Sequence, residues 1–190
     1  MPRTEEQFER MREASRAKIL HAALHVFARR GFHSTTMAAI AKRAGVATGL
    51  LYNYFKSKDD LLAEILEQSK AELSALIKQH LSTAGKGDLG GFMSALLPDL
   101  KKRLPTSRLV LSIALQPETK HISKGTPRAF ETLLMKAAPH GVVTKSGETW
   151  SAHETAEVLH AIIMAQCVTE NDALVQRLVA LLPKGRVRND

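Results

Sequence analysis

The chain has 190 residues, with 44% hydrophobic and only 5% aromatic residues. This content is enough for a packed core and too high for a disordered chain, and the core must rest on aliphatic side chains. The formal net charge of +8 favours a polyanionic partner, nucleic acid or an anionic membrane surface, although many basic proteins bind neither. Lys and Arg exceed Asp and Glu by five within residues 1–60 and by three in the rest, so positive charge is densest in the first third.

Several classes of protein are excluded by what the sequence lacks. Cys167 is the single cysteine, so neither an internal disulfide nor a multi-cysteine zinc site can form. No apolar run approaches the length of a membrane span, and the first fifteen residues lack the apolar segment of a signal peptide. We therefore expect a cytoplasmic protein with no membrane partner and no cofactor.

The first predicted helix covers residues 16–30, where apolar residues recur at helical spacing before Gly31 provides a stop. Upstream, Thr4 and Gln7 have the spacing of a capping box, so this helix could begin much earlier. Residues 1–15 could equally be a mobile basic arm that reaches a DNA backbone or minor groove.

A short helix, a turn and a second short helix are predicted next. Thr35 or Thr36 caps a helix that ends at Ala44, and Gly45 supplies the turn because a side chain would penalise a positive φ there. The following helix covers residues 48–55 and buries one apolar face, after which residues 57–60 begin a long helix that reaches residue 83.

The remaining chain is also predicted to be helical. Pro98 is expected to kink or divide one of these helices, and residues 139–149 are expected to form a loop, with strand-like alternation only around residues 142–144. Helix signals cover residues 88–104, 106–115, 127–138, 151–169 and 171–183. Ser151 and Glu154 have the spacing of a capping box at the start of the fourth of these helices.

Residues 17–63 resemble the DNA-binding domain of the tetracycline-repressor (TetR) family. The resemblance is carried by many positions at fixed spacing: Gly31-Phe32, Thr35-Thr36, Ile40-Ala41, Ala44-Gly45-Val46, Gly49, Leu51-Tyr52, Tyr54-Phe55 and Lys56-Ser57-Lys58. It implies an all-α fold, with an N-terminal three-helix helix-turn-helix DNA-binding domain in residues 1–58. Residues 59–190 would then form a helical effector-binding and dimerisation domain. The implied function is that of a homodimeric transcriptional repressor released from double-stranded operator DNA by a small-molecule effector.

The resemblance also assigns DNA contacts residue by residue. Thr36 and Tyr52 would contact phosphates and Lys58 would meet a phosphate at the next helix, while the start of the recognition helix faces the groove. Two departures matter: Ala47 stands where Ser is common, so Thr48 could be the cap, and Leu50 stands where Thr is common, which favours a thymine methyl. Alternatively the tyrosines pack between helices and the lysines are solvated charge. The implied set is Thr36, Met37, Thr48, Gly49, Leu50, Tyr52, Asn53, Tyr54, Lys56 and Lys58.

The C-terminal helices offer weaker signals. His153, His160 and Cys167 lie on one helix face, but successive members are two turns apart, about 10 Å of rise, which is too far for one metal ion. We expect that face to line an interface or a pocket. Predicted effector-pocket residues are Phe92, Met93, Leu97, Arg108, Phe130, Met135, Trp150 and His160. Predicted dimer-interface residues, which could instead be monomer core, are Val158, Leu159, Ile162, Ile163, Leu174, Leu178 and Leu181.

Two other functions compete with operator binding. An enzyme on a helical scaffold is disfavoured because no metal-ligand cluster, glycine-rich phosphate loop or nucleophile motif is present, so no catalytic residue is predicted. A helical interaction module that has lost DNA binding would tolerate alanine at Thr48, Tyr52 and Lys58.

Overall fold

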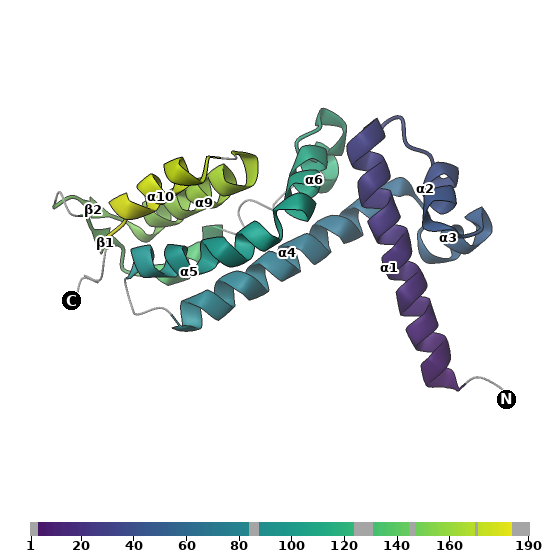
Figure 1. Cartoon of the computed structure of the whole chain (residues 1–190), viewed down its shortest axis with the longest axis horizontal. Coiled ribbons are helices and arrows are strands. Elements are labelled where there is room, and N and C mark those ends of the chain that lie inside the picture. The colour runs from purple at the N-terminus through teal and green to yellow at the C-terminus, as the bar shows by residue number, and fades with distance from the viewer. Residues whose placement is uncertain (1–3, 84–87, 124–130, 145–146, 170, 184–190) are drawn as a thin grey trace. The chain divides into compact units, whose positions relative to one another are not determined.

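The computed structural model describes residues 4–83, 88–123, 131–144, 147–169 and 171–183 (Figure 1). These residues are almost all helical, and their one sheet is a two-stranded antiparallel hairpin, which confirms the predicted all-α class. The chain divides into two compact units, residues 1–69 with 109–124, and residues 70–108 with 125–190. No helix in the described ranges is both long enough and apolar enough to span a bilayer.

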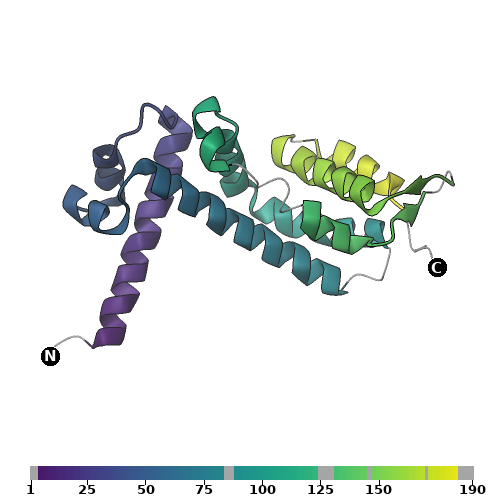
Figure 2. The same cartoon turned by 180° about the vertical axis from the view of Figure 1, so that it is seen from behind.

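The first unit is built around one long helix and two short ones. Its elements are α1 (Glu5–Arg30), α2 (Met37–Ala44), α3 (Thr48–Tyr54), the first turns of α4 (Lys58–Thr83), the end of α6 (Leu104–Ala114), η1 (Pro117–Thr119) and α7 (Lys120–Ser123). The N-terminal half of α1 extends beyond α2 and α3 in both views (Figures 1 and 2).

The beginning of α1 decides between the two predictions for the N-terminal residues, a helix that starts early and a mobile arm. The Thr4 hydroxyl accepts the Gln7 N–H and the Gln7 amide oxygen accepts the Thr4 N–H, so the capping box is formed and the helix starts at Glu5. The alternative of a mobile arm is therefore wrong for residues 5–15. Glu6 and Arg10 form an exposed ion pair one turn apart, which supports this part of the helix only weakly.

The core of the first unit joins segments that are far apart in the sequence. Ile19, Phe27, Ile40, Leu51 and Leu61 are fully buried in one hydrophobic cluster, and Ile113 of α6 is buried in the same cluster. The Gln116 side-chain oxygen also accepts the Phe32 N–H at 3.0 Å. The predicted division between residues 58 and 59 therefore does not coincide with the compact units, because α4 and α6 both complete this core.

The second unit contains α5 (Leu89–Lys102), β1 (Val142–Val143), β2 (Thr149–Trp150), α9 (Ala152–Val168), α10 (Asp172–Leu181), η2 (Met135–Ala137) and the last turns of α4. Val142 pairs with Trp150 and Val143 with Thr149 in the hairpin that leads into α9. Helices α5, α9 and α10 pack on one another, and polar contacts reinforce the packing. His80 of α4 lies 3.1 Å from Asp99 of α5, and Lys101 of α5 pairs with Asp172 of α10.

Several predicted boundaries differ from the structure. Pro98 lies inside α5 without dividing it, and α6 already begins at Leu104. Residues 131–134 are helical and a 3-10 turn follows, while the predicted start of that helix at Pro127 lies outside the described residues. The predicted loop of residues 139–149 contains β1 and the first residue of β2, and η1 and α7 were not predicted. The Ser151 capping box of α9 is confirmed, since Ser151 and Glu154 exchange hydrogen bonds.

Candidate nucleic-acid interface

The α2–α3 pair is fixed from behind by apolar side chains. Ile40 and Leu51 are each 0% exposed, and Ala41 and Phe55 are buried beside them in the cluster formed with α1. Leu51 and Phe55 are four residues apart, so they lie on the same side of this short segment. The opposite side of α3 is therefore left facing outward.

A tight turn joins the two short helices. Gly45 adopts the left-handed conformation, with φ 66° and ψ 35°, and its N–H bonds back to the carbonyls of Ala41 and Lys42. Any other residue would place a Cβ in a conformation that L-amino acids disfavour. Ala47 occupies the N-cap position of α3 without a side-chain hydrogen bond, so the prediction that Thr48 caps this helix is wrong.

The outward side of α3 carries short polar groups and two larger side chains. Leu50 is 39% exposed and Tyr52 is 50% exposed. Tyr54 differs from this set because it is half-buried against the core cluster, so it offers less surface to a ligand than predicted. The exposed residues of this face are Thr48, Gly49, Leu50, Tyr52 and Asn53.

The beginning of α2 lies at the end of a loop and is capped by Thr36. Its hydroxyl accepts the Ala39 N–H at 3.2 Å, and the same hydroxyl has a proton that it can donate outward. Thr35, the alternative cap, is buried instead, and its hydroxyl donates to the Gly31 carbonyl at 2.7 Å. Met37 is half-buried against the core, so its predicted place in a DNA contact is only partly open.

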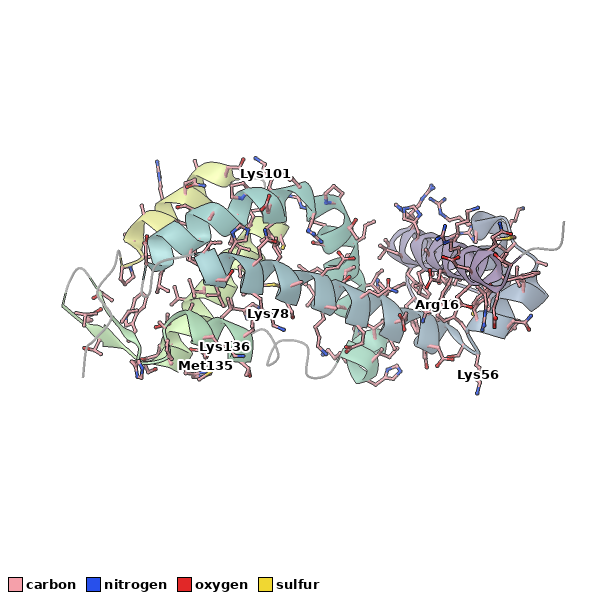
Figure 3. All side chains as sticks on the ribbon, turned by 90° about the horizontal axis from the view of Figure 1, so that it is seen from below. Arg16, Lys56, Lys78, Lys101, Met135 and Lys136 are labelled. Carbon is pink, nitrogen blue, oxygen red and sulfur yellow. The ribbon has the colours of Figure 1, made fainter. Side chains whose placement is uncertain are left out.

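Lys58 and Lys56 differ sharply although both were predicted to contact DNA. The Lys58 ammonium donates to the carbonyls of Phe32, His33 and Thr35 at 2.9, 2.9 and 3.2 Å, and it lies 4.8 Å from the centre of the Phe32 ring. An ammonium has three protons, so these bonds occupy all of them and leave none for a phosphate in this arrangement. The Lys56 side chain is exposed and points away from the domain (Figure 3).

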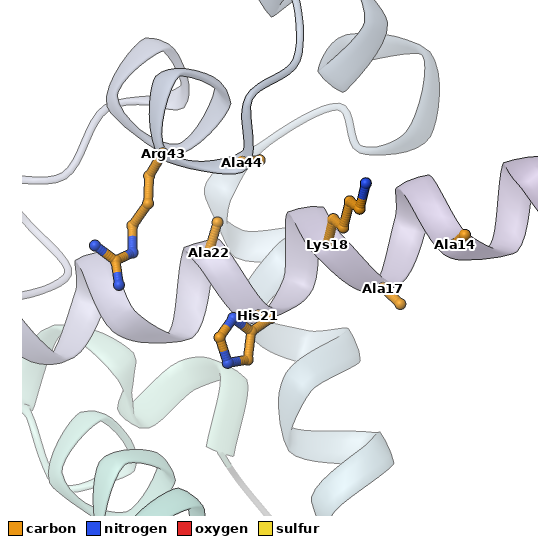
Figure 4. Close-up of a pocket in the computed structure, with 7 residues that line it drawn as sticks. All are labelled: Ala14, Ala17, Lys18, His21, Ala22, Arg43 and Ala44. Carbon is orange, nitrogen blue, oxygen red and sulfur yellow. The ribbon is translucent and has the colours of Figure 1, made fainter.

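More positive charge lies where α1 meets the end of α2. An open hollow of about 600 Å³ is lined by Lys18, His21, Arg43 and small alanines (Figure 4). Partial burial lowers the pKa of His25, and the nearby His21 and Arg43 side chains lower it further. Elsewhere on α1, the Arg16 guanidinium donates a hydrogen bond to Glu64 of α4 at 3.0 Å. This hydrogen bond lowers the pKa of the Glu64 carboxyl.

The predicted effector-pocket residues do not form one exposed set. Phe92, Met93 and Leu97 are at most 2% exposed in the core of the second unit. Arg108 has a structural role instead: its Nε donates to the Cys167 carbonyl at 2.9 Å and its Nη2 to the Thr169 carbonyl at 3.3 Å, which caps the end of α9.

The other predicted pocket residues are scattered. His160 is half-buried, with Nδ1 3.8 Å from a Glu131 carboxylate oxygen. Met135 is 36% exposed in η2, Trp150 is half-buried in β2, and Phe130 lies outside the described residues. Of the stripe on α9, His153 is exposed while Cys167 is buried, and burial raises the pKa of the Cys167 thiol. No group of three potential metal ligands occurs among the described residues.

The predicted dimer-interface residues fall into two groups. Leu159, Ile162 and Ile163 are 0%, 3% and 3% exposed, so they belong to the core of the second unit and expose no surface to a partner. That part of the prediction is wrong because α9 is covered within its own chain. Val158 is half-buried. On α10, Leu174 and Leu181 are exposed, and Leu178 between them is half-buried, so Leu174, Leu178 and Leu181 form an apolar stripe that is open at both ends.

Comparison with known proteins agrees with this geometry. The family model "Bacterial regulatory proteins, tetR family" matches residues 19–65, which hold α2, α3 and their supports. The transcriptional regulator BetI of Vibrio campbellii is 38% identical over 72 residues, which cover 38% of this chain and 36% of that protein. Residues 19–65 are therefore similar to the tetR family of bacterial regulatory proteins. The chain matches these curated relatives over only about a third of their length.

Solved structures of other regulators extend the likeness to the fold of most of the chain. NalD of Pseudomonas aeruginosa, described as the secondary repressor of the MexAB-OprM efflux pump, has a TM-score of 0.65 at 22% identity and covers 90% of this chain and 94% of its own. FadR of Bacillus subtilis, solved with stearoyl-CoA, has a TM-score of 0.68 at 19% identity and covers 87% and 96%. At these identities the likeness concerns the fold alone.

Proposed function

We propose that this chain is a homodimeric, DNA-binding transcriptional regulator, most simply a repressor that a small molecule releases from its operator. One observation carries the proposal: α3 is anchored by Leu51 at 0% exposure while its opposite face presents hydroxyl, amide and aromatic groups. A short helix held rigidly from behind, with short polar groups outward, is suited to reading the edges of bases in the major groove.

The exposed residues divide into two kinds of contact. Thr48 and Asn53 can hydrogen-bond to base edges, and Leu50 can contact a thymine methyl. Thr36, Tyr52 and Lys56 carry donors suited to phosphates, which position the helix without reading sequence. Because the Lys58 ammonium is held by three carbonyls, we assign it to positioning the loop before Thr36 rather than to a phosphate.

A second copy of the chain would supply the second reading helix. The open stripe on α10 has the spacing i, i+4, i+7, which aligns its leucines on one helix face. Pairing this stripe with its copy about a two-fold axis would bury it and match a palindromic operator with half-sites about 34 Å apart.

Release by a small molecule requires that the ligand bind the DNA-incompetent arrangement better than the competent one. The second unit is our candidate for the ligand-binding part. The support is the fold it shares with FadR, which was solved with stearoyl-CoA. Helix α4 contributes residues to both units, so it is the natural element to carry the coupling.

Fluorescence anisotropy would test DNA binding, using DNA that flanks the protein's own gene, a scrambled duplex and a salt series. Thr48→Ala and Tyr52→Phe should each weaken specific binding roughly tenfold, since each removes a hydrogen bond to a base or a phosphate. Lys56→Ala should reduce the slope of log affinity against log salt by about 1, because one phosphate contact is lost. Thr106→Ala on α6, exposed and outside the interface, is the control.

One outcome of the anisotropy experiment would contradict the proposal. Binding that is equal on scrambled DNA and indifferent to all three interface substitutions would mean that α3 does not read DNA, and the helical scaffold would then serve another purpose.

A further inference from the structure

Two histidines on α1 direct the same ring nitrogen at each other. His21 and His25 are four residues apart, and their Nε2 atoms are 3.3 Å apart in hydrogen-bond geometry. The ring centres are 4.6 Å apart with an angle of 66° between the ring planes. One nitrogen must carry a proton and the other a lone pair, so a single proton occupies the space between them.

A metal ion can take the place of that proton. Imidazole nitrogens bind zinc at about 2.0–2.1 Å, and nitrogens 3.3 Å apart would then subtend roughly 105° at the ion, close to a tetrahedral angle. We propose that His21 and His25 chelate one divalent late transition-metal ion of the Zn²⁺, Ni²⁺ or Cu²⁺ class through their Nε2 atoms. The proposal concerns α1 alone and does not depend on DNA binding.

The surroundings leave room for the rest of the coordination sphere. His21 is exposed and lines the open hollow next to Ala17 and Ala22, whose small side chains do not cover it (Figure 4). Since the described residues contain no group of three potential ligands, water completes the coordination. The site is therefore open and exchangeable, and weaker than a structural zinc site with four protein ligands.

Nearby charge determines which ions fit. Lys18 and Arg43 line the same hollow, and their positive charge opposes any cation. Mg²⁺ and Ca²⁺ depend on oxygen ligands, which this pair lacks, so they are excluded. Late transition metals gain enough from two imidazoles to bind there. Arg43→Ala should consequently tighten the binding, an effect opposite to that of losing a ligand.

Titration calorimetry of the untagged full-length protein with NiCl₂ and with ZnCl₂ tests the site. We expect one ion per chain and at least a tenfold loss of affinity in His21→Ala and in His25→Ala. His33→Ala is the matched control, because His33 is an exposed histidine of the same unit outside the pair. Since the bound ion stabilises only the folded chain, the wild-type melting temperature should rise with metal, and the rise should vanish in His21→Ala.

Each alternative outcome is distinguishable. Affinity unchanged in His21→Ala would overturn the proposal and place the ion at another histidine, such as His153, which lies 3.5 Å from Glu157. Equal melting temperatures of wild type and His21→Ala without metal would show that a loss of binding is not a loss of fold. X-ray absorption of the Zn²⁺ complex should detect two imidazole ligands, and fewer than two would also overturn the proposal.

Discussion

At the scale of single residues, side chains of the same type make different contacts in the structure. Lys56 and Lys58 are two positions apart, yet Lys56 is exposed whereas Lys58 holds three backbone carbonyls. Arg108, predicted to line an effector pocket, instead caps α9. In each case the tertiary partner is a main-chain carbonyl, and sequence patterns carry no information on which carbonyls a cation will reach.

The Lys58 contacts predict an asymmetry between the two lysines. Lys58→Ala should lower the free energy of unfolding by about 1–3 kcal/mol, since hydrogen bonds from a charged group to partly buried carbonyls are lost. Lys56→Ala should change it by less than about 0.5 kcal/mol, as expected for an exposed side chain. Urea denaturation followed by circular dichroism measures both. Equal effects would show that the Lys58 contacts contribute no stability.

At the scale of elements, the turn between α2 and α3 shows why glycine is needed at one position and not at its neighbour. Gly45 has φ 66°, whereas Gly49 lies in α3 without a positive φ, and an added Cβ would meet nothing within 4 Å at either position. The two glycines thus differ in backbone conformation and not in available space.

This difference predicts opposite effects of the same substitution. Gly45→Ala should destabilise the protein by about 1–2 kcal/mol through left-handed strain alone. Gly49→Ala should leave stability unchanged or raise it by up to about 1 kcal/mol, because alanine favours the helix. If Gly49 faces the groove closely, Gly49→Ala should nevertheless weaken DNA binding. Thermal unfolding and anisotropy on the same variants separate the two effects, and a destabilised Gly49→Ala would contradict the assignment.

At the scale of the whole molecule, the apolar stripe on α10 is exposed in a way that the contacts within one chain do not explain. Leu174 is 44% exposed and Leu181 is 69% exposed, while Val175 and Val179 of the same helix are buried. A helix that buries one face and leaves a second apolar face open is typical of a subunit whose partner is absent.

Sedimentation velocity would test this interpretation. Leu174→Gln with Leu181→Gln should shift the protein from dimer to monomer at micromolar concentration, because polar groups would replace the apolar contact. Gln176→Ala, exposed on the other side of α10, should leave the dimer intact. A wild type that is already monomeric, or a double variant that still dimerises, would remove α10 from the proposed interface.

The sequence by itself determined the helical class, the Thr4 and Ser151 capping boxes, and the turn at Gly45. These features are local, since periodicity, caps and turns involve residues within about four positions of one another. It also indicated the TetR-type helix-turn-helix that the family model matches at residues 19–65, because many residues there agree at fixed spacing.

Only the tertiary structure decided which apolar faces are buried and which polar side chains are engaged within the chain. It placed Leu159 and Ile163 in the core, and it brought Ile113 into the same hydrophobic cluster as Leu51. It also engaged Lys58 and Arg108 with carbonyls that are distant in sequence. An apolar helix face reads the same in sequence whether its own chain or a partner covers it, because burial depends on contacts between residues that no local pattern relates.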